Sequence, residues 1–342
     1  MQRGSTQVDS TPLESTHQHV VFGAGLIGGF LYGALASQGF LVAMIARPSV
    51  QEKLRGGLQL SDYQDNTATV TSPRFVAKEN VAADYVWLTV KCTAIADVAA
   101  DLTGYVHENT VIFCCQNGLG SDGVIKQAFP NNRVLKVMVP FNVVEMSPGH
   151  LHRGSEGQLT LECSDPSTVD KDVQSIIKQL HSPLMPVCGS EDIKAILWAK
   201  LQLNLVNAIN ALADIPVKPM LEERGYRRCM ALLMEELLTV VNKKNITLPK
   251  LTALPPFLIP KLMKVPDVVF RILASKMLAV DPNVRTSMWW DLSNAKHTEI
   301  EFINGAILEE AKVLGVDCPA NEAMVRLVRE VERGERSQGM SS

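Results

Sequence analysis

A lysine and two asparagines recur at helical spacing in the second half of the 342-residue chain. In the segment WAKLQLNLVN, residues 198–207, they are Lys200, Asn204 and Asn207. On a continuous helix Asn204 lies about 40° from Lys200, and Asn207 lies about 20° from it on the other side. Apolar residues flank this stripe, and buried polar groups are costly without partners. The pattern indicates a ligand or catalytic site in which a desolvated lysine serves as an acid; an exposed amphipathic face is the alternative.

A second polar segment lies nearer the C-terminus, where Ser287 follows Thr286 and Glu299 comes later in a helical pattern. Taken without further information, Thr286 or Ser287 is a helix N-cap, and Glu299 is a solvated helix charge.

A glycine-rich segment near the N-terminus has the pattern GxGxxG. It follows the β-branched run His19–Phe22, opens a helical stretch, and consists of Gly23, Ala24, Gly25, Leu26, Ile27 and Gly28. In this context the first glycine permits a tight turn, the second lets the backbone approach a pyrophosphate, and the third allows close helix–strand packing. The helix N-terminus then faces the negative charge. We predict a dinucleotide site, with a turn that binds no ligand as the alternative.

Three further residues follow predicted strands. Arg47 stands where an NAD-specific site usually carries an acid for the ribose, and a cation there pairs with the 2′-phosphate of NADP. We therefore predict NADPH, the alternative being that Arg47 is a solvated loop residue. Lys91 and Asn117 end two other strands, at the edge where open α/β sheets bind ligands, unless they merely cap those strands.

The elements that position these residues change character along the chain. Up to about residue 188, strands alternate with helical stretches such as Leu26–Gln38 and Thr93–Leu102, which predicts parallel βαβ units. We expect Leu151–Arg153 and Gln158–Glu162 to form an added hairpin, followed by a helix over Val169–Leu180 and a last strand. The strand runs are His19–Phe22, Phe40–Ile45, Tyr85–Val90, Val111–Cys115 and Val134–Val139.

Beyond residue 190 helical periodicity dominates, so the predicted fold class is α/β, with a Rossmann-type doubly wound sheet followed by an all-α C-terminal domain. The helical windows are 193–212, 226–242, 287–314 and 321–333. Six prolines in 248–282 predict short helices and turns there. The predicted organisation is a disordered tail over 1–18, an NADP-binding domain over 19–190, a helical substrate and catalytic domain over 191–335, and a tail over 336–342.

Composition excludes several classes of protein. The hydrophobic share of 46%, the charged share of 20% and the net charge of −3 are those of a globular chain, with no reason to expect nucleic acid or a membrane as partner. Seven scattered cysteines and the lack of a secretory signal predict a cytoplasmic protein. His150 and His152 alternate on one strand, but without a third ligand they are expected on a surface hairpin rather than at a metal.

Together these motifs resemble the ketopantoate reductase family from His19 to Arg333. The shared motifs are the glycine loop, Arg47, Val90-Lys91, Gln116-Asn117-Gly118, Trp198-x-Lys200-Leu201-x-x-Asn204, and Ser287-Met288 with Thr298-Glu299-Ile300 and Asn304-Gly305. The last two of these motifs are the most specific, because few other Rossmann families pair them in this order. The resemblance implies NADPH-dependent reduction of a 2-keto acid, 2-dehydropantoate (ketopantoate), to pantoate in pantothenate biosynthesis.

The resemblance also implies roles for the site residues. Lys200 would be the general acid that protonates the ketone oxygen, and Glu299 would orient this lysine and contact cofactor or substrate. The substrate would be bound by Asn204, Asn207 and Ser287, and the nicotinamide side would be lined by Lys91 and Asn117. A homodimer is kept as a candidate assembly.

The chain departs from the family pattern at several positions. Ala208 stands where many members carry a second asparagine, Trp289-Trp290 is bulkier than usual, and 248–285 resembles an insertion found in a longer subgroup. The alternatives are therefore a reductase of another 2-keto acid and a β-hydroxyacid dehydrogenase related to 6-phosphogluconate dehydrogenase. In that second group the lysine follows a glycine-rich segment, which 192–197 lacks. A non-enzymatic NADPH sensor is the third alternative.

Overall fold

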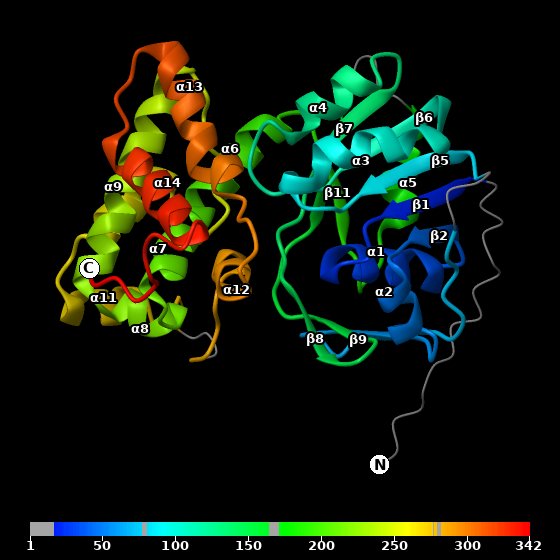
Figure 1. Cartoon of the computed structure of the whole chain (residues 1–342), viewed down its shortest axis with the longest axis horizontal. Coiled ribbons are helices and arrows are strands. Elements are labelled where there is room, and N and C mark those ends of the chain that lie inside the picture. Colours follow the sequence, from blue (N-terminus) through cyan, green and yellow to red (C-terminus); the bar gives the residue numbers. More distant parts are fainter. Residues whose placement is uncertain (1–16, 77–80, 164–170, 276, 279–281) are drawn as a thin grey trace. The chain divides into compact units, whose positions relative to one another are not determined.

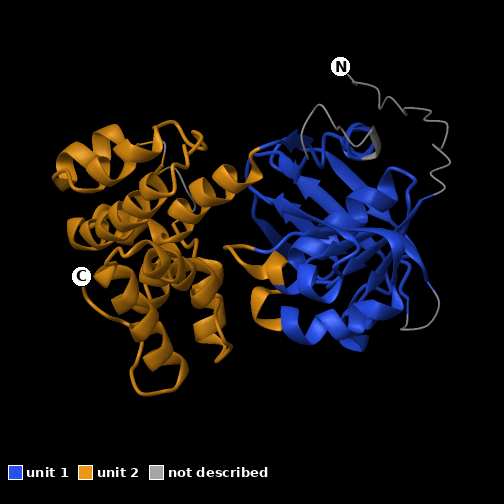
Figure 2. Ribbon diagram, turned by 90° about the horizontal axis from the view of Figure 1, so that it is seen from above, with its two compact units in different colours: residues 1–90, 95–116, 124–191 blue, residues 91–94, 117–123, 192–342 orange. Residues whose placement is uncertain are grey.

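The computed structural model describes residues 17–76, 81–163, 171–275, 277–278 and 282–342. The chain forms two compact units (Figure 2). Unit 1 contains the chain up to residue 90, together with 95–116 and 124–191. Unit 2 contains residues 192–342, together with the short segments 91–94 and 117–123.

Among the described residues, most strands of unit 1 form one seven-stranded sheet, with the order β11-β10-β7-β6-β5-β1-β2 (Figure 1). Neighbouring strands are parallel except β10 and β7, which are antiparallel. The strand order reverses at β1, which lies between β2 and β5, and such a reversal creates a ligand crevice at the carboxyl ends of the strands. The strands are β1 (Gln18–Phe22), β2 (Leu41–Ile45), β5 (Ala83–Leu88), β6 (Val106–Cys114), β7 (Arg133–Met138), β10 (Leu159–Glu162) and β11 (Val187–Ser190).

Both faces of this sheet are buried, because alternate residues of each strand enter different cores. In β1, Val21 packs in one hydrophobic cluster, whereas Val20 and Phe22 pack in another. Helices α1 (Leu26–Ser37) and α5 (Lys171–Leu180) contribute to the first cluster, and α3 (Ile95–Asp101) and α4 (Ser121–Ala128) to the second. Burial on both sides produces the continuous apolar strands seen in the sequence and confirms the doubly wound fold.

The predicted hairpin over 151–162 is wrong. β9 (His150–Arg153) belongs to a separate four-stranded sheet with the order β4-β3-β9-β8, whereas β10 joins the seven-stranded sheet. The burial pattern explains the difference, because Leu159, Thr160 and Leu161 are all buried, as expected for a strand inside a sheet. The other strands of the small sheet are β3 (Leu58–Asp62), β4 (Thr67–Val70) and β8 (Val143–Ser147).

The small sheet packs on α1, where two glycines make room for its leucines. A Cβ built on Gly29 would lie 2.9 Å from Leu151, and one built on Gly33 would lie 2.8 Å from Leu60. The sheet therefore fixes the far side of the helix that opens at the glycine loop.

Unit 2 is helical throughout its described residues, which confirms the all-α part of the predicted fold. Its core is built on α9, whose residues Met230, Leu233, Leu237 and Val241 are all buried. The proline-rich segment forms the short elements that were predicted: the 3₁₀ turn η4 (Pro256–Leu258), α10 (Ile259–Met263) and α11 (Asp267–Leu273). The remaining elements are α6 (Ile193–Asn204), α7 (Val206–Ala213), α8 (Val217–Glu222), α9 (Arg224–Lys243), α12 (Ser287–Ser293), the π-helix η5 (Glu301–Gly305), α13 (Ala306–Leu314) and α14 (Pro319–Glu332).

Two of the predicted helical windows are each divided. The window 193–212 consists of α6 and α7, which are separated at Leu205. The window 287–314 consists of α12, η5 and α13, and the chain turns before η5 at Ala295, which has a φ of 50°. Neither break contains glycine or proline, which are the strongest local signals for the end of a helix.

The predicted tails also need correction. Gln18 begins β1 rather than ending a tail, and its backbone N–H donates to Asp84 at 2.7 Å; residues 1–16 lie outside the described part. The segment 336–342 packs along α7, because the amides of Gly339 and Met340 donate to the Leu212 carbonyl at 2.8 and 3.0 Å. No helix among the described residues is long and apolar enough to span a membrane.

Candidate active site

The backbone of the glycine loop is constrained by a positive φ at Gly23 and by the close contact of Gly28 with the Gly23 carbonyl. Gly23 has a φ of +109°, which L side chains rarely adopt, and a Cβ on Gly28 would lie 1.8 Å from the Gly23 carbonyl oxygen. The Thr89 hydroxyl, just after β5, donates to the same carbonyl at 2.6 Å. The first and third glycines are therefore required by the turn itself.

The second glycine serves a different purpose. Gly25 is the N-cap of α1 and supplies no side-chain cap, and a Cβ built on it would meet nothing within 4 Å. The N-terminus of α1 thus faces open space beside a residue without a side chain. Oriented N–H groups at a helix start suit a pyrophosphate, so the loop fits a dinucleotide.

Arg47 follows β2 on the same edge of the sheet. The Gly23 amide donates to the Ile45 carbonyl at 3.4 Å, which brings the end of β2 beside the loop. Arg47 is exposed and caps α2 (Pro48–Lys53) through its backbone. A guanidinium at this place is available to a 2′-phosphate.

Lys91 and Asn117 belong to the two short segments that are part of unit 2. The Lys91 ammonium pairs with the buried carboxylate of Asp291 on α12. Asn117 precedes Gly118, whose neighbour Leu119 donates its amide to the Phe302 carbonyl at 3.0 Å. Lys91 is thus held against α12, and the segment that follows Asn117 is held against η5, just after Glu299.

Glu299 lies just before the π-helix η5 and is buried. Its Oε1 accepts a hydrogen bond from the Cys92 backbone N–H at 2.9 Å. Burial raises the pKa of this carboxyl, and the bond from Cys92 works in the opposite direction. Glu299 is therefore not the solvated helix charge that the sequence alone favoured, and π-turns are frequent at functional sites.

Lys200 and Asn204 lie on α6, which the Asp192 side chain caps by accepting from the Ala195 amide at 3.0 Å. Burial lowers the pKa of Lys200 to about 8. Such a lysine exchanges its proton close to neutral pH. Asn207 lies on α7, beyond the break at Leu205, so the predicted stripe is not carried by one continuous helix.

Ser287 is the first residue of α12, and its neighbour Thr286 is the N-cap. The Thr286 backbone amide and hydroxyl both donate to Asn210 Oδ1, each at 3.0 Å. Asn210 is fully buried on α7, three residues after Asn207. It fixes the start of α12 relative to α7, and the sequence did not indicate it because its partner Thr286 lies 76 residues further along the chain.

The structure thus groups the predicted residues in two sets. The glycine loop and Arg47 belong to unit 1, and the others belong to unit 2. Within unit 2, Lys91, Asn117 and Glu299 are joined through Cys92, and Ser287 is joined to α7 through Thr286 and Asn210. Asp291, Cys92 and Asn210 are the residues of these networks that the sequence did not indicate.

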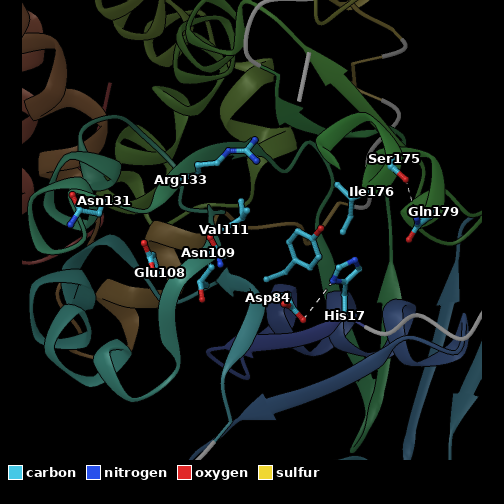
Figure 3. Close-up of a pocket in the computed structure, with 12 residues that line it drawn as sticks. His17, Asp84, Glu108, Asn109, Val111, Asn131, Arg133, Ser175, Ile176 and Gln179 are labelled. Atoms are coloured by element: carbon cyan, nitrogen blue, oxygen red, sulfur yellow. Dashed lines mark hydrogen bonds and ion pairs between the residues drawn. The ribbon is translucent and has the colours of Figure 1, made fainter. Parts of the chain in front are cut away.

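A pocket of about 510 Å³ in unit 1 lies elsewhere (Figure 3). Its walls include Asp84 and Arg133 at the amino ends of β5 and β7, and Ser175 of α5. The glycine loop follows the carboxyl end of β1, which is parallel to β5, so this pocket lies at the opposite edge of the sheet. It is not the nucleotide crevice.

Among the described residues, no three His, Cys, Asp or Glu side chains gather as a metal site. His150 and His152 both hydrogen-bond to the Ser61 hydroxyl, at 2.8 and 2.9 Å, across β9 and β3. All seven cysteines fall in the described part of the chain and are free thiols.

Comparison with known proteins follows the two halves of the chain. The family "Ketopantoate reductase PanE/ApbA" matches residues 19–166, and its C-terminal counterpart matches residues 192–332. The chain belongs to the ketopantoate reductase family. It is an oxidoreductase of the CH–OH class that uses a nicotinamide cofactor.

Individual relatives are distant but cover nearly the whole chain. A 2-dehydropantoate 2-reductase of Archaeoglobus fulgidus is 24% identical over 315 residues, which is 92% of this chain and 97% of the relative. A ketopantoate reductase structure from Ralstonia eutropha JMP134 has a TM-score of 0.75 at 26% identity, covering 94% of this chain and all of that one.

Two further structures share the fold. D-mandelate dehydrogenase with NADH and anilino(oxo)acetate has a TM-score of 0.75 at 19% identity, and the match covers 93% of this chain and 99% of the other. The dimeric ketopantoate reductase of Staphylococcus aureus has a TM-score of 0.70 at 19% identity, with 93% and 100% covered.

Proposed function

We propose that the protein reduces 2-dehydropantoate to pantoate with NADPH, a step towards pantothenate. The observation that carries this proposal is the match of the family to both halves of the chain. The partly buried Lys200, whose pKa desolvation lowers to about 8, supports it. Relatives named 2-dehydropantoate 2-reductase favour this substrate over other 2-keto acids.

NADPH, when bound, supplies a hydride to the ketone carbon. The backbone of Gly23–Gly28 and the N-terminus of α1 would hold its pyrophosphate, and Arg47 would pair with its 2′-phosphate. The absence of an acid at position 47 supports NADPH over NADH. Lys91 and Asn117 would line the nicotinamide side.

Lys200 would act as the general acid. A ketone oxygen gains negative charge as hydride arrives at its carbon, and an ammonium stabilises that charge and donates the proton. A pKa of about 8 keeps most of Lys200 protonated at neutral pH while leaving the proton easy to transfer. Asn204, Asn207 and Ser287 would hold the substrate, and Glu299 would orient the lysine or accept a substrate hydroxyl.

The test is the initial rate of NADPH oxidation with ketopantoate, 2-ketoisovalerate and pyruvate, each repeated with NADH. Ketopantoate should have the highest kcat/KM, because a site that pairs its extra hydroxyl rejects analogues that leave the partner unpaired. Equal kcat/KM for 2-ketoisovalerate would remove the pantoate assignment and leave only the reductase class.

A second candidate is the same reaction on a bulkier 2-keto acid. It is favoured by Trp290, three residues after the proposed substrate residue Ser287, because an exposed indole can stack on an aromatic ring. An aromatic 2-keto acid such as phenylglyoxylate belongs in the same panel, and a higher kcat/KM for it would select this candidate.

We also propose a cytoplasmic homodimer. Free thiols at all seven cysteines suit a reducing compartment, and a family member from Staphylococcus aureus is dimeric. Light scattering coupled to gel filtration measures the mass in solution, and a value near the 37.5 kDa of one chain would reject the dimer.

A further inference from the structure

Cys92 lies at the centre of a polar network in unit 2. Its side chain is only 2% exposed. Its backbone N–H donates to Glu299 Oε1 at 2.9 Å, and its thiol donates to the Asn117 carbonyl oxygen at 3.0 Å. The residue before it, Lys91, pairs with Asp291. One cysteine therefore connects three of the residues that the sequence marked for function.

The thiol remains a donor under ordinary conditions. Burial, and next the neighbouring charge of Glu299, raise the pKa of the Cys92 thiol far above its usual range. A protonated thiol does not act as a nucleophile, so covalent catalysis or facile oxidation is not its role. What it offers is an S–H group that faces the Asn117 carbonyl oxygen and the Glu299 carboxyl.

The two bonds act on different parts of the site. The N–H bond holds the carboxyl of Glu299, whose desolvation would otherwise be less compensated. The S–H bond holds the main chain of Asn117 in a segment that is already fixed on its other side by the contact of Gly118 with Phe302. The path of this segment determines where the Asn117 amide lies.

We propose that Cys92 is a positioning residue of the reductase site, whose thiol and backbone N–H keep Asn117, Glu299 and Lys91 in one arrangement. The inference rests on the proposed function, since it assigns these three residues to catalysis. Cys92 itself need not touch substrate or cofactor.

The test compares Cys92→Ala, Cys92→Ser and wild type by kcat, KM and hydrogen exchange of the segments 91–94 and 117–123. Alanine removes the thiol donor and keeps the backbone N–H, and the loss of one hydrogen bond predicts a three- to tenfold fall in kcat, as a rough figure. Serine restores a donor and should return kcat to within about twofold of wild type. Exchange of 117–123 should be faster in the alanine variant and restored in the serine variant.

Cys318→Ala is the matched control, because Cys318 is another buried thiol of unit 2 and makes no side-chain cap bond at α14. It should leave kcat and the exchange of both segments unchanged. If alanine and serine variants lose kcat equally, packing and not the donor matters, and the proposal is overturned. Unchanged kcat and exchange in Cys92→Ala overturn it as well.

Failure of the proposed function is a separate result. If the wild type turns over no 2-keto acid, the assignment to catalysis is lost, and hydrogen exchange still decides whether the Cys92 thiol holds 117–123. Normal exchange in the alanine variant would then reject the positioning role by itself.

Discussion

The main chains of Gly118 and Phe302 are in direct contact. A Cβ built on Gly118 would stand 2.1 Å from the Phe302 carbonyl oxygen, and Gly118 has a φ of +79°. The same carbonyl accepts the amide of Leu119 at 3.0 Å. The glycine after Asn117 is thus required twice, by its own backbone conformation and by a partner far away in the sequence.

Gly118→Ala should therefore destabilise the protein. Strain at a positive φ costs about 1–3 kcal/mol, and the contact with backbone atoms adds to it. We expect the Tm, measured by circular dichroism, to fall by at least about 3 °C. Gly123→Ala is the control, because a Cβ there meets nothing within 4 Å, and it should leave the Tm unchanged or slightly higher. Equal Tm values for the two variants would contradict the described path of 117–119.

Lys200→Ala should abolish most turnover. General acid catalysis contributes typically 10²–10⁴-fold, so kcat with ketopantoate should fall by at least about two decades. NADPH affinity, measured by fluorescence titration, should stay within a few-fold because the proposed cofactor residues Gly23–Gly28 and Arg47 belong to unit 1. Lys194→Ala removes an exposed lysine from the same helix and should be as active as wild type. A Lys200→Ala enzyme with most of its kcat would show that another residue is the acid.

The dependence of kcat/KM on pH should reflect the ionisation of Lys200. Burial lowers the pKa of Lys200 to about 8, and only the ammonium form present below that pH can donate a proton. We expect kcat/KM to be flat below pH 8 on this limb and to fall as pH rises through about 8. Lys200→Arg carries a cation that does not titrate in this range, so the alkaline limb should disappear in any activity that remains. An unchanged alkaline limb would assign it to a different group.

Arg47→Asp should change cofactor preference. A guanidinium–phosphate contact is charge-assisted, and its loss predicts a 2′-phosphate affinity lower by about one to two decades. The dissociation constant of NADPH should rise accordingly, whereas that of NADH should stay the same or improve. Arg55→Asp, an exposed arginine after α2 that pairs with Glu52, is the charge-matched control and should affect NADPH little. The same NADPH affinity in Arg47→Asp and wild type would leave Arg47 as a solvated residue.

Much of unit 1 could be predicted because its signals are local. β1, the glycine loop and α1 follow one another within twenty residues. The apolar runs arise because neighbouring strand residues such as Val20 and Val21 are both buried, on opposite faces of the sheet. The small sheet was missed, although Leu58–Asp62 and Thr67–Val70 alternate around a turn at Asp65, which has a φ of 65°. That pattern was a usable hairpin signal.

The site was only partly predictable, for a physical reason. The sequence indicates which side chains are polar within apolar helices, as for Lys200, but not which distant backbone groups meet them. Glu299 looked like a solvated charge because its partner, the Cys92 N–H, lies 207 residues earlier in the chain. The break at Leu205 was invisible as well, since α7 continues the apolar periodicity of α6.

The family matches of residues 19–166 and 192–332 suggest that the chain could be cut between them into two independent proteins. The composition of unit 2 argues against this. An excised fragment 192–342 would lack the segments 91–94 and 117–123, and with them the ammonium that pairs with Asp291 and the N–H that pairs with Glu299. Two carboxylates would lose their partners, and buried ones are costly to leave uncompensated. The helical half therefore depends on segments outside its own linear range, and a fragment 192–342 should have a lower Tm than the full chain.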